Sequence, residues 1–216
     1  MAFVLTYDSL TTSVQAYLER KDATLVAQIP LFIMLGQRRA ARDLKILGLK
    51  VAITDNLIVS ASVVAKPTRW LNDSSFNIGT NVGVATGFKT RLFLQERSYE
   101  WCRTYWPDPT QIGTPKYYAS DYNYNFWFLV PTPDQIYPYE ILYYETPPFI
   151  DETLSTNFLT GSVPEVLLYA TLLETASYLK DDERIPVWTD YYEKAKKNVG
   201  DEDIRRIYDA YSKRGG

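Results

Sequence analysis

The sequence predicts an α+β fold: helices from both ends of the chain form one bundle, and an antiparallel β domain, sandwich-like or barrel-like, is inserted between them. Apolar residues recur at helical spacing near both ends of the 216-residue chain. The middle is rich in β-branched and aromatic residues and is punctuated by prolines, as short strands joined by turns are. Because an amphipathic helix must bury its apolar stripe, we expect residues 1–48 and 151–216 to form the bundle and residues 49–150 the inserted domain.

The N-terminal segment is expected to form two helices. Asp8 is a suitable N-cap for the first of them. The apolar positions of this helix are Leu10, Val14, Tyr17 and Leu18. The second helix is expected to begin near Pro30, because proline is tolerated in a first helical turn. Its apolar stripe comprises Ile29, Ile33, Gly36, Ala40, Leu44 and Leu47.

Three basic residues, Arg38, Arg42 and Lys45, recur three to four residues apart on another face of the second helix. Such a row is either a solvated face or a docking strip for an acidic neighbour. Both interpretations stay open at this point.

The middle of the chain is expected to be β structure. The predicted strands are Val51–Ile53, Leu57–Val64, Arg91–Leu94, Asn125–Val130 and Tyr139–Tyr144. Asp55 and Asn56, between the first two runs, are predicted to form a tight hairpin turn. A short helix carrying Cys102 is expected within residues 97–106. Gly79, Gly83 and Gly87 recur without a phosphate-binding motif, so we interpret the region around them, with Asn81, as a hairpin loop that contacts a neighbour.

The C-terminal segment returns to helix. Ser162 and Glu165 have the spacing of a capping box at the start of the first of these helices. Asp181 and Asp182 are expected to cap a second helix, which Gly200 ends. A third helix is then expected from Asp201, with Ile204, Ile207, Tyr208 and Tyr211 on its apolar positions, followed by a short polar tail.

Composition argues against catalysis. The chain has no histidine and one cysteine, so the commonest general base and a cysteine zinc cage are both missing, and we expect no enzyme activity, metal or cofactor. Residues 121–125 match half of a calcium-binding loop, but Phe126 and Thr132 stand where glycine and glutamate are required. The net charge of −3 does not favour reading of nucleic-acid sequence. No stretch is long enough for a membrane span, so a soluble, intracellular protein is expected.

Tyrosine is abundant, with 18 copies beside 5 tryptophans. These aromatics indicate either a tyrosine-rich β core or surfaces that contact other proteins.

The order of motifs resembles that of a known family. The segments concerned are Thr6–Leu10 with Tyr17–Asp22, Ile29–Ile33 with Arg38 to Asp43, Gly113–Ala119, Phe128–Asp134 with Leu142–Tyr144, Asn157–Leu159, Val163–Ala170, and Tyr178–Arg184 with Trp188 and Tyr191–Tyr192. Each segment alone is weak evidence, and together they span most of the chain in the right order. The chain thus resembles the head–tail adaptor, or connector, proteins of tailed bacteriophages. The region from Gly79 to Gly87 has no counterpart in that pattern.

The resemblance implies a ring, usually of twelve copies, below the portal protein of the capsid. It implies contacts with portal and with tail or nozzle proteins, and passage of double-stranded DNA through the ring without sequence reading. The expected locations are the head–tail interface of the virion and the host cytoplasm during assembly.

Within such a ring, we expect roles for particular residues. Portal docking is expected from Ile207, Tyr208, Tyr211, Ser212, Lys213, Arg214, Gly215 and Gly216. Contacts between subunits are expected from Arg38, Arg42, Lys45, Asp181, Asp182 and Glu183. A tail-facing loop is expected from Gly79, Asn81, Gly83 and Gly87.

Two alternatives stay open from the sequence. One is another neck protein with the same layout, such as a tail-completion or stopper protein. The other is a β module that binds carbohydrate through its aromatic side chains.

Overall fold

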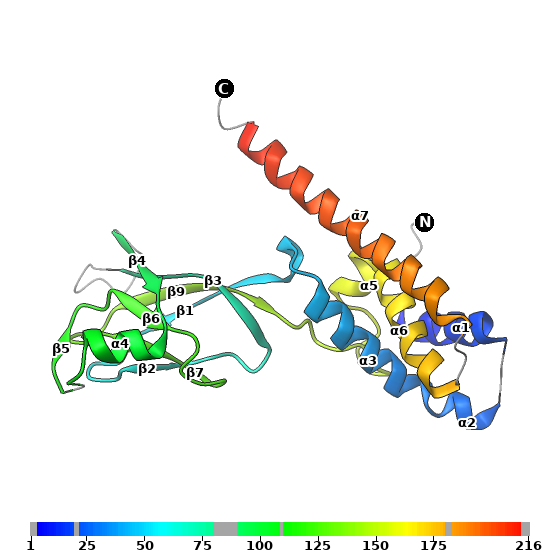
Figure 1. The fold of residues 1–216 in the computed structure, drawn as a ribbon, viewed down its shortest axis with the longest axis horizontal. Helices are drawn as coiled ribbons and strands as arrows, with labels where there is room; N and C mark the ends of the chain where they lie inside the picture. The colour runs from blue at the N-terminus through cyan, green and yellow to red at the C-terminus, as the bar shows by residue number, and fades with distance from the viewer. Residues whose placement is uncertain (1–3, 20–21, 80–89, 109, 180–182, 213–216) are drawn as a thin grey trace. The chain divides into compact units, whose positions relative to one another are not determined.

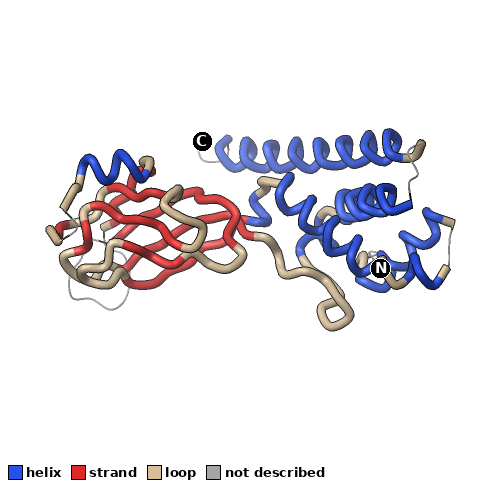
Figure 2. Tube along the Cα trace, turned by 60° about the horizontal axis from the view of Figure 1, so that its bottom comes forward, coloured by secondary structure: helices blue, strands red, loops and turns tan. Residues whose placement is uncertain are grey.

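The computed structural model describes residues 4–19, 22–79, 90–108, 110–179 and 183–212. The chain divides into two compact units, Met1–Leu49 with Thr146–Gly216, and Lys50–Glu145. The first is helical and the second is built on a curled β-sheet (Figures 1 and 2). The predicted α+β class, with helices at both ends of the chain and a central β domain, is confirmed. Among the described residues, no helix is both long and apolar enough to cross a lipid bilayer.

The helical unit is made of segments from both ends of the chain. Its elements are α1 (Tyr7–Leu18), α2 (Ala23–Val26), α3 (Ile29–Asp43), the 3-10 helix η1 (Leu47–Leu49), α5 (Phe158–Ser162), α6 (Pro164–Leu179) and α7 (Ile185–Ser212). Thr6, not Asp8, caps α1: its hydroxyl accepts the Ser9 backbone N–H at 3.2 Å, and the Ser9 hydroxyl accepts the Thr6 N–H at 2.8 Å. Asp8 lies instead in the first turn, where a carboxylate interacts favourably with the helix dipole.

The core of the helical unit lies between α3 and α6. Ile29, Ile33 and Ala40 are fully buried, as the predicted stripe requires. Leu47 is 45% exposed, because α3 ends at Asp43 and helical spacing no longer applies beyond that residue. Where α3 meets α6, Gly36 has no side chain, and its backbone faces Thr171. A Cβ at this position would lie 2.7–2.9 Å from the hydroxyl, N and Cα of Thr171. The two helices therefore approach each other at a point where only glycine fits.

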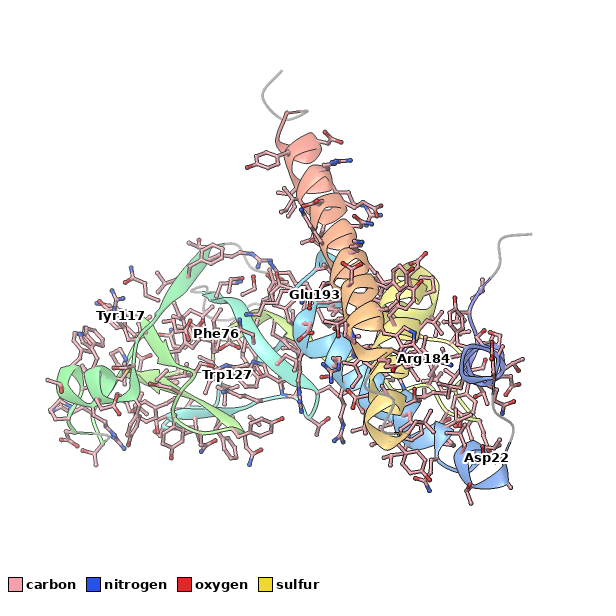
Figure 3. All side chains as sticks on the ribbon, turned by 45° about the vertical axis from the view of Figure 1, so that its right-hand side comes forward. Asp22, Phe76, Tyr117, Trp127, Arg184 and Glu193 are labelled. Carbon is pink, nitrogen blue, oxygen red and sulfur yellow. The ribbon has the colours of Figure 1, made fainter. Side chains whose placement is uncertain are left out.

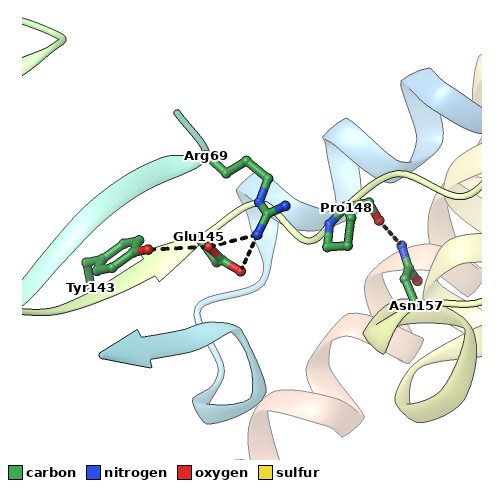
Figure 4. A network of polar contacts seen from close by, with 5 residues as sticks. All are labelled: Arg69, Tyr143, Glu145, Pro148 and Asn157. Carbon is green, nitrogen blue, oxygen red and sulfur yellow. Dashed lines mark hydrogen bonds and ion pairs between the residues drawn. The ribbon is translucent and has the colours of Figure 1, made fainter. Parts of the chain in front are cut away.

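A buried amide holds the returning chain against α3. Gln37 is fully buried; its side-chain oxygen accepts the Ile150 backbone N–H at 2.8 Å and an N–H of Asn157 at 3.1 Å, and its amide donates to the Ile150 carbonyl at 3.4 Å. Asn157 also donates to the Pro148 carbonyl at 2.8 Å (Figure 4). One side chain of α3 thus satisfies backbone groups more than a hundred residues away in sequence.

Replacing Gln37 with leucine tests this connection. The substitution nearly preserves volume but leaves the Ile150 N–H and the Asn157 amide without their acceptor. A buried polar group without a partner costs about 1–3 kcal/mol, so we expect a loss of about 2 kcal/mol in the free energy of unfolding. Urea denaturation measures it. As a control, Gln15→Leu on α1 lies outside this network and should change stability by less than about 0.5 kcal/mol; equal effects of the two substitutions would contradict the assignment.

The C-terminal helices depart from the sequence-based expectation in two places. The Ser162–Glu165 capping box is wrong, because Ser162 ends α5 and α6 begins at Pro164. The break at Gly200 is also wrong, because α7 continues through that residue. A glycine inside a helix costs only about 1 kcal/mol relative to alanine, and such a cost does not terminate a helix that is packed on α6. Beyond Gly200, α7 still contacts its own unit, where Asp203 accepts the Leu47 N–H at 3.1 Å, and its last turns extend past the other helices (Figure 1).

The second unit is a seven-stranded sheet among the described residues. In spatial order the strands are β1 (Lys50–Asn56), β9 (Pro138–Glu145), β3 (Trp70–Gly79), β4 (Arg91–Glu96), β6 (Tyr117–Ala119), β7 (Phe126–Val130) and β2 (Val63–Ala65). The pairings are antiparallel except for β4 with β6, which is parallel. A two-stranded parallel ladder joins β5 (Ile112–Gly113) to β8 (Thr132–Pro133), and α4 (Tyr99–Tyr105) lies after β4.

The two end strands of the curled sheet, β1 and β2, are consecutive in the chain. The predicted turn at Asp55 and Asn56 is wrong: both residues belong to β1 and pair with β9. The chain then continues along its partners, with the Leu57 N–H donating to the Tyr137 carbonyl at 2.8 Å and the Leu129 N–H donating to the Ser62 carbonyl at 2.7 Å. These bonds extend the β1–β9 and β2–β7 pairings along the segment that joins β1 to β2. Arg69, before β3, donates to both oxygens of Glu145 at 3.2 and 3.4 Å (Figure 4).

Aromatic side chains fill the curled sheet. The Phe76 ring lies 5.3 Å from that of Tyr118, 5.6 Å from Tyr139 and 6.0 Å from Trp127, between ring centroids. Phe76 and Trp127 are almost completely buried (Figure 3). A smaller cluster, Cys102 with Ala119, Phe128 and Val130, packs α4 against the sheet. Part of the tyrosine content therefore serves the β core.

Candidate functional site

Two observations bear on the reactivity of the described residues. Burial raises the pKa of the Cys102 thiol to about 11, so the side chain stays a neutral thiol at physiological pH and is a poor nucleophile. In the part of the chain that the structure describes, no group of three or more histidine, cysteine or carboxylate residues is placed to hold a metal ion. The candidate functional features are therefore exposed side chains.

A polar cluster in the β unit has a structural explanation. The Asp73 carboxylate accepts the indole N–H of Trp70 at 2.7 Å and that of Trp127 at 2.9–3.0 Å. Lys66 lies 3.7 Å from the Trp70 ring centroid and donates to the Ser120 carbonyl at 2.7 Å. Burial is the main cause that lowers the pKa of Lys66, and the charge of Asp73 opposes this shift. With these groups paired to one another, the cluster stabilises the sheet.

The predicted basic strip is only partly formed. Arg38 and Arg42 lie one turn apart on α3, on a hollow of about 370 Å³ that we call the α3 groove. The α3 groove is lined by Leu35, Arg38, Arg39, Arg42, Asp43 and Glu174. Lys45 does not continue the row, because it follows the end of α3.

Two guanidinium groups of the α3 groove are not neutralised. Arg39 pairs with Glu174 at 2.6 Å, and Asp43 accepts the Tyr192 hydroxyl at 2.7 Å. The Arg38 guanidinium lies 5.7 Å from the Phe149 ring centroid. Among the described residues, neither Arg38 nor Arg42 forms an ion pair, so both remain able to bind an anion.

The carboxylates predicted to face the strip are mostly not placed. Glu183 is exposed just before α7, and Asp181 and Asp182 lie outside the described residues. The nearby run at residues 201–203 is partly engaged within the chain: Glu202 pairs with Arg206, and Asp203 accepts the Leu47 N–H at 3.1 Å.

The distal part of α7 carries an uncovered apolar face. Ile204 is 51% exposed, Ile207 is 36% exposed and Tyr208 is 70% exposed. Their spacing of three and four residues places them on one side of the helix. Tyr211 and Ser212 continue the same helix, and Lys213, Arg214, Gly215 and Gly216 lie outside the described residues. We call the side formed by Ile204, Ile207 and Tyr208 the distal α7 face.

The predicted loop residues are only partly placed. Gly79 is the buried last residue of β3, paired with Arg91, rather than part of a loop. Asn81, Gly83 and Gly87 lie outside the described residues.

Sequence reasoning missed an aromatic surface on α4. Trp101 and Tyr105 stack with ring centroids 5.0 Å apart and planes 9° apart, and Tyr117 meets Trp101 edge-on at 4.7 Å. Arg97 lies 5.5 Å from the Trp101 ring centroid. Tryptophan, tyrosine and arginine are the residues most enriched at binding hot spots. The four-residue spacing of Trp101 and Tyr105 in a predicted helix was the signal available in the sequence.

Similarity to known proteins identifies the family of the chain. No curated protein matches the chain. The family model described as SU10 adaptor protein matches residues 5–214, which is nearly the whole chain. This family comprises structural adaptor proteins of phages and is not an enzyme family. The chain therefore belongs to the SU10 adaptor protein family.

Proposed function

We propose that this chain is the head-to-tail adaptor of a phage virion, forming a ring of twelve copies that joins the portal protein to the tail or nozzle. Assembly takes place in the host cytoplasm, and double-stranded DNA crosses the ring without being read. Family membership supports the adaptor role. The net charge of −3 suits a channel that must not retain DNA, because an acidic surface repels the phosphate backbone.

The distal α7 face is the observation that carries this proposal. Exposed Ile204, Ile207 and Tyr208 form an apolar stripe on the C-terminal part of α7, whose last turns extend past the other helices of the unit (Figure 1). An amphipathic helix with an uncovered apolar side typically lies in a groove of a partner. We assign this face to portal docking, together with Tyr211, Ser212 and the tail from Lys213 to Gly216.

Two further surfaces complete the proposed assembly. Arg38 and Arg42, with Lys45 nearby, supply the basic side of the contact between neighbouring copies, and residues 181–183 are one candidate for the acidic side. The region that follows Gly79, including Asn81, Gly83 and Gly87, faces the tail. A ring requires two different patches on each copy, because its interfaces are head-to-tail.

Electron microscopy of the full chain mixed with its cognate portal tests the proposal. We expect a second ring stacked on the portal. Ile207→Ser with Tyr208→Ser should abolish stacking, because it removes the apolar side chains that a partner groove covers. Val187→Ser is the matched control: Val187 is 50% exposed on the same helix, about 30 Å before the distal face.

The outcomes discriminate between the candidate proteins. Stacking by Val187→Ser but not by the double variant supports docking through the distal α7 face. Stacking by both variants would place the docking site on another surface of the chain. A wild-type chain that ignores the portal and binds only to a preformed adaptor ring is a stopper instead.

A further inference from the structure

We propose that the α3 groove of each copy receives an acidic corner of the next copy, formed by Asp8, Asp151 and Glu152. The proposal rests on the ring put forward above and names both sides of its subunit contact. The occupant of the groove is a second copy of this chain.

The α3 groove has side chains that suit the binding of carboxylates. Arg38 and Arg42 are exposed, lie one helical turn apart and form no ion pair among the described residues. Arginine binds carboxylates with a planar fork of N–H donors, and two such groups can hold two acidic side chains. Leu35 adds an apolar floor to the hollow of about 370 Å³.

The acidic corner is held in place by its backbone. The Tyr7 N–H donates to the Ser155 carbonyl at 2.9 Å, which ties the segment after Ile150 to the start of α1. Asp151 accepts the N–H groups of Thr153 and Leu154 at 2.7 and 2.8 Å, and the Thr153 hydroxyl at 2.6 Å. These bonds fix the loop, so little conformational freedom is lost when it binds.

The three carboxylates of the corner all act electrostatically on the Tyr7 hydroxyl, whose backbone N–H bonds to Ser155. Burial raises the pKa of the Tyr7 hydroxyl, and the charges of Glu152, Asp151 and Asp8 raise it further. In the described part of the chain, none of the three forms an ion pair. The corner therefore presents three negative charges to the solvent beside the 38%-exposed Leu154.

Arg42 projects away from the segment that carries the corner, whereas Arg38 lies near that segment, with its guanidinium 5.7 Å from the Phe149 ring centroid. Gln37 points toward the segment that carries Asp151, since its side chain bonds to Ile150. An α-helix turns about 100° per residue, so Arg42 projects about 140° away from Gln37 around α3. A head-to-tail contact needs two such separate patches, whereas a single self-complementary patch would give a closed dimer.

Other acidic side chains of the helical unit are less suited to this role. Several carboxylates of α7 are already paired within the same helix: Asp190 with Lys194, Glu193 with Lys196 and Glu202 with Arg206. Of the run at residues 181–183, the structure describes Glu183 alone. Among the described residues, the corner offers three carboxylates that form no ion pair.

A charge swap between two variants of the full chain tests the pairing. The first variant carries Arg38→Glu and Arg42→Glu, and the second carries Asp8→Lys and Glu152→Lys. In the first variant the groove and the corner are both acidic, and in the second both are basic. Because the contacting patches then repel each other, we expect ring formation on the portal to weaken by more than about tenfold in each variant. An equimolar mixture should restore rings, because each acidic groove meets a basic corner. Electron microscopy and mass photometry measure ring yield, and circular dichroism checks that each variant is folded.

Each outcome has a distinct meaning. Restoration by the mixture, and by the chain that carries all four substitutions, supports the pairing. Rings that form normally in the first variant refute the groove as an interface while leaving the adaptor role intact. Loss that the second variant does not rescue assigns the groove to another occupant, such as residues 181–183 or a portal subunit. A wild-type chain that forms no ring overturns both proposals. If Asp8→Lys impairs folding, Glu152→Lys alone replaces it in the mixture.

Discussion

Trp127→Ala is expected to destabilise the β unit more than any other single substitution considered. The side chain is fully buried, packs against Phe76, and donates its indole N–H to Asp73 at 2.9–3.0 Å. Removing a buried tryptophan costs about 3–5 kcal/mol through lost burial and the remaining cavity. Here the Asp73 carboxylate also loses a donor, so we expect the upper end of that range. Thermal and urea unfolding measure the loss.

Two further variants separate the contributions. Trp127→Phe keeps most of the ring but removes the indole N–H, so we expect a smaller loss that reports the bond to Asp73. Trp101→Ala removes the same side chain from α4, where it is 38% exposed, and should cost about 1 kcal/mol. A loss at Trp101 as large as that at Trp127 would show that burial does not govern the cost in this unit.

Gly36→Ala is expected to separate α3 from α6. The new Cβ would lie 2.7–2.9 Å from the hydroxyl, N and Cα of Thr171, and backbone atoms cannot move aside as the end of a flexible side chain can. Overpacking of this kind costs about 1–3 kcal/mol. Because the new Cβ meets backbone atoms, we expect a loss of about 3 kcal/mol in the free energy of unfolding. The free energy of unfolding, measured in urea, reports this loss.

Gly200→Ala is the matched control with the opposite sign. Gly200 lies inside α7, and a Cβ there meets no atom within 4 Å. Alanine favours a helix by about 0.8–1 kcal/mol over glycine, so this variant should be more stable than the wild type. The same chemical change is thus expected to destabilise one helix and stabilise another. Stabilisation by both substitutions would mean that α3 and α6 do not pack closely at Gly36.

Local rules predicted the existence of elements better than their limits. The apolar stripe of α3 is buried from Ile29 to Ala40 because helical spacing directly reports which side chains share a face. The same rule fails at Leu47, beyond the end of the helix. Gly200 and the Asp55–Asn56 pair were interpreted as breaks because their local propensities favour breaks. Packing of α7 on α6 and pairing of β1 with β9 outweigh those propensities.

The candidate surfaces were also predictable from the sequence only in part. Arg38 and Arg42 were predictable as a pair, because a spacing of four residues places them on one side of any helix. Neither forms an ion pair among the described residues, whereas Arg39 between them pairs with Glu174, on a helix 135 residues away in sequence. The gathering of Asp8 with Asp151 and Glu152 could not be foreseen either, because it depends on the long-range bond from Tyr7 to Ser155.

By itself, the sequence determined the α+β class, the absence of histidine and of a cysteine zinc cage, and the helical character of both chain ends. These properties follow from composition and from the spacing of apolar residues along the chain. Only the tertiary structure decided that Gln37 holds the returning segment, that residues 57–62 bond to the neighbours of both end strands, and which of the described charged side chains form no ion pair. Each of these depends on contacts between residues far apart in sequence, and local spacing carries no information about such contacts.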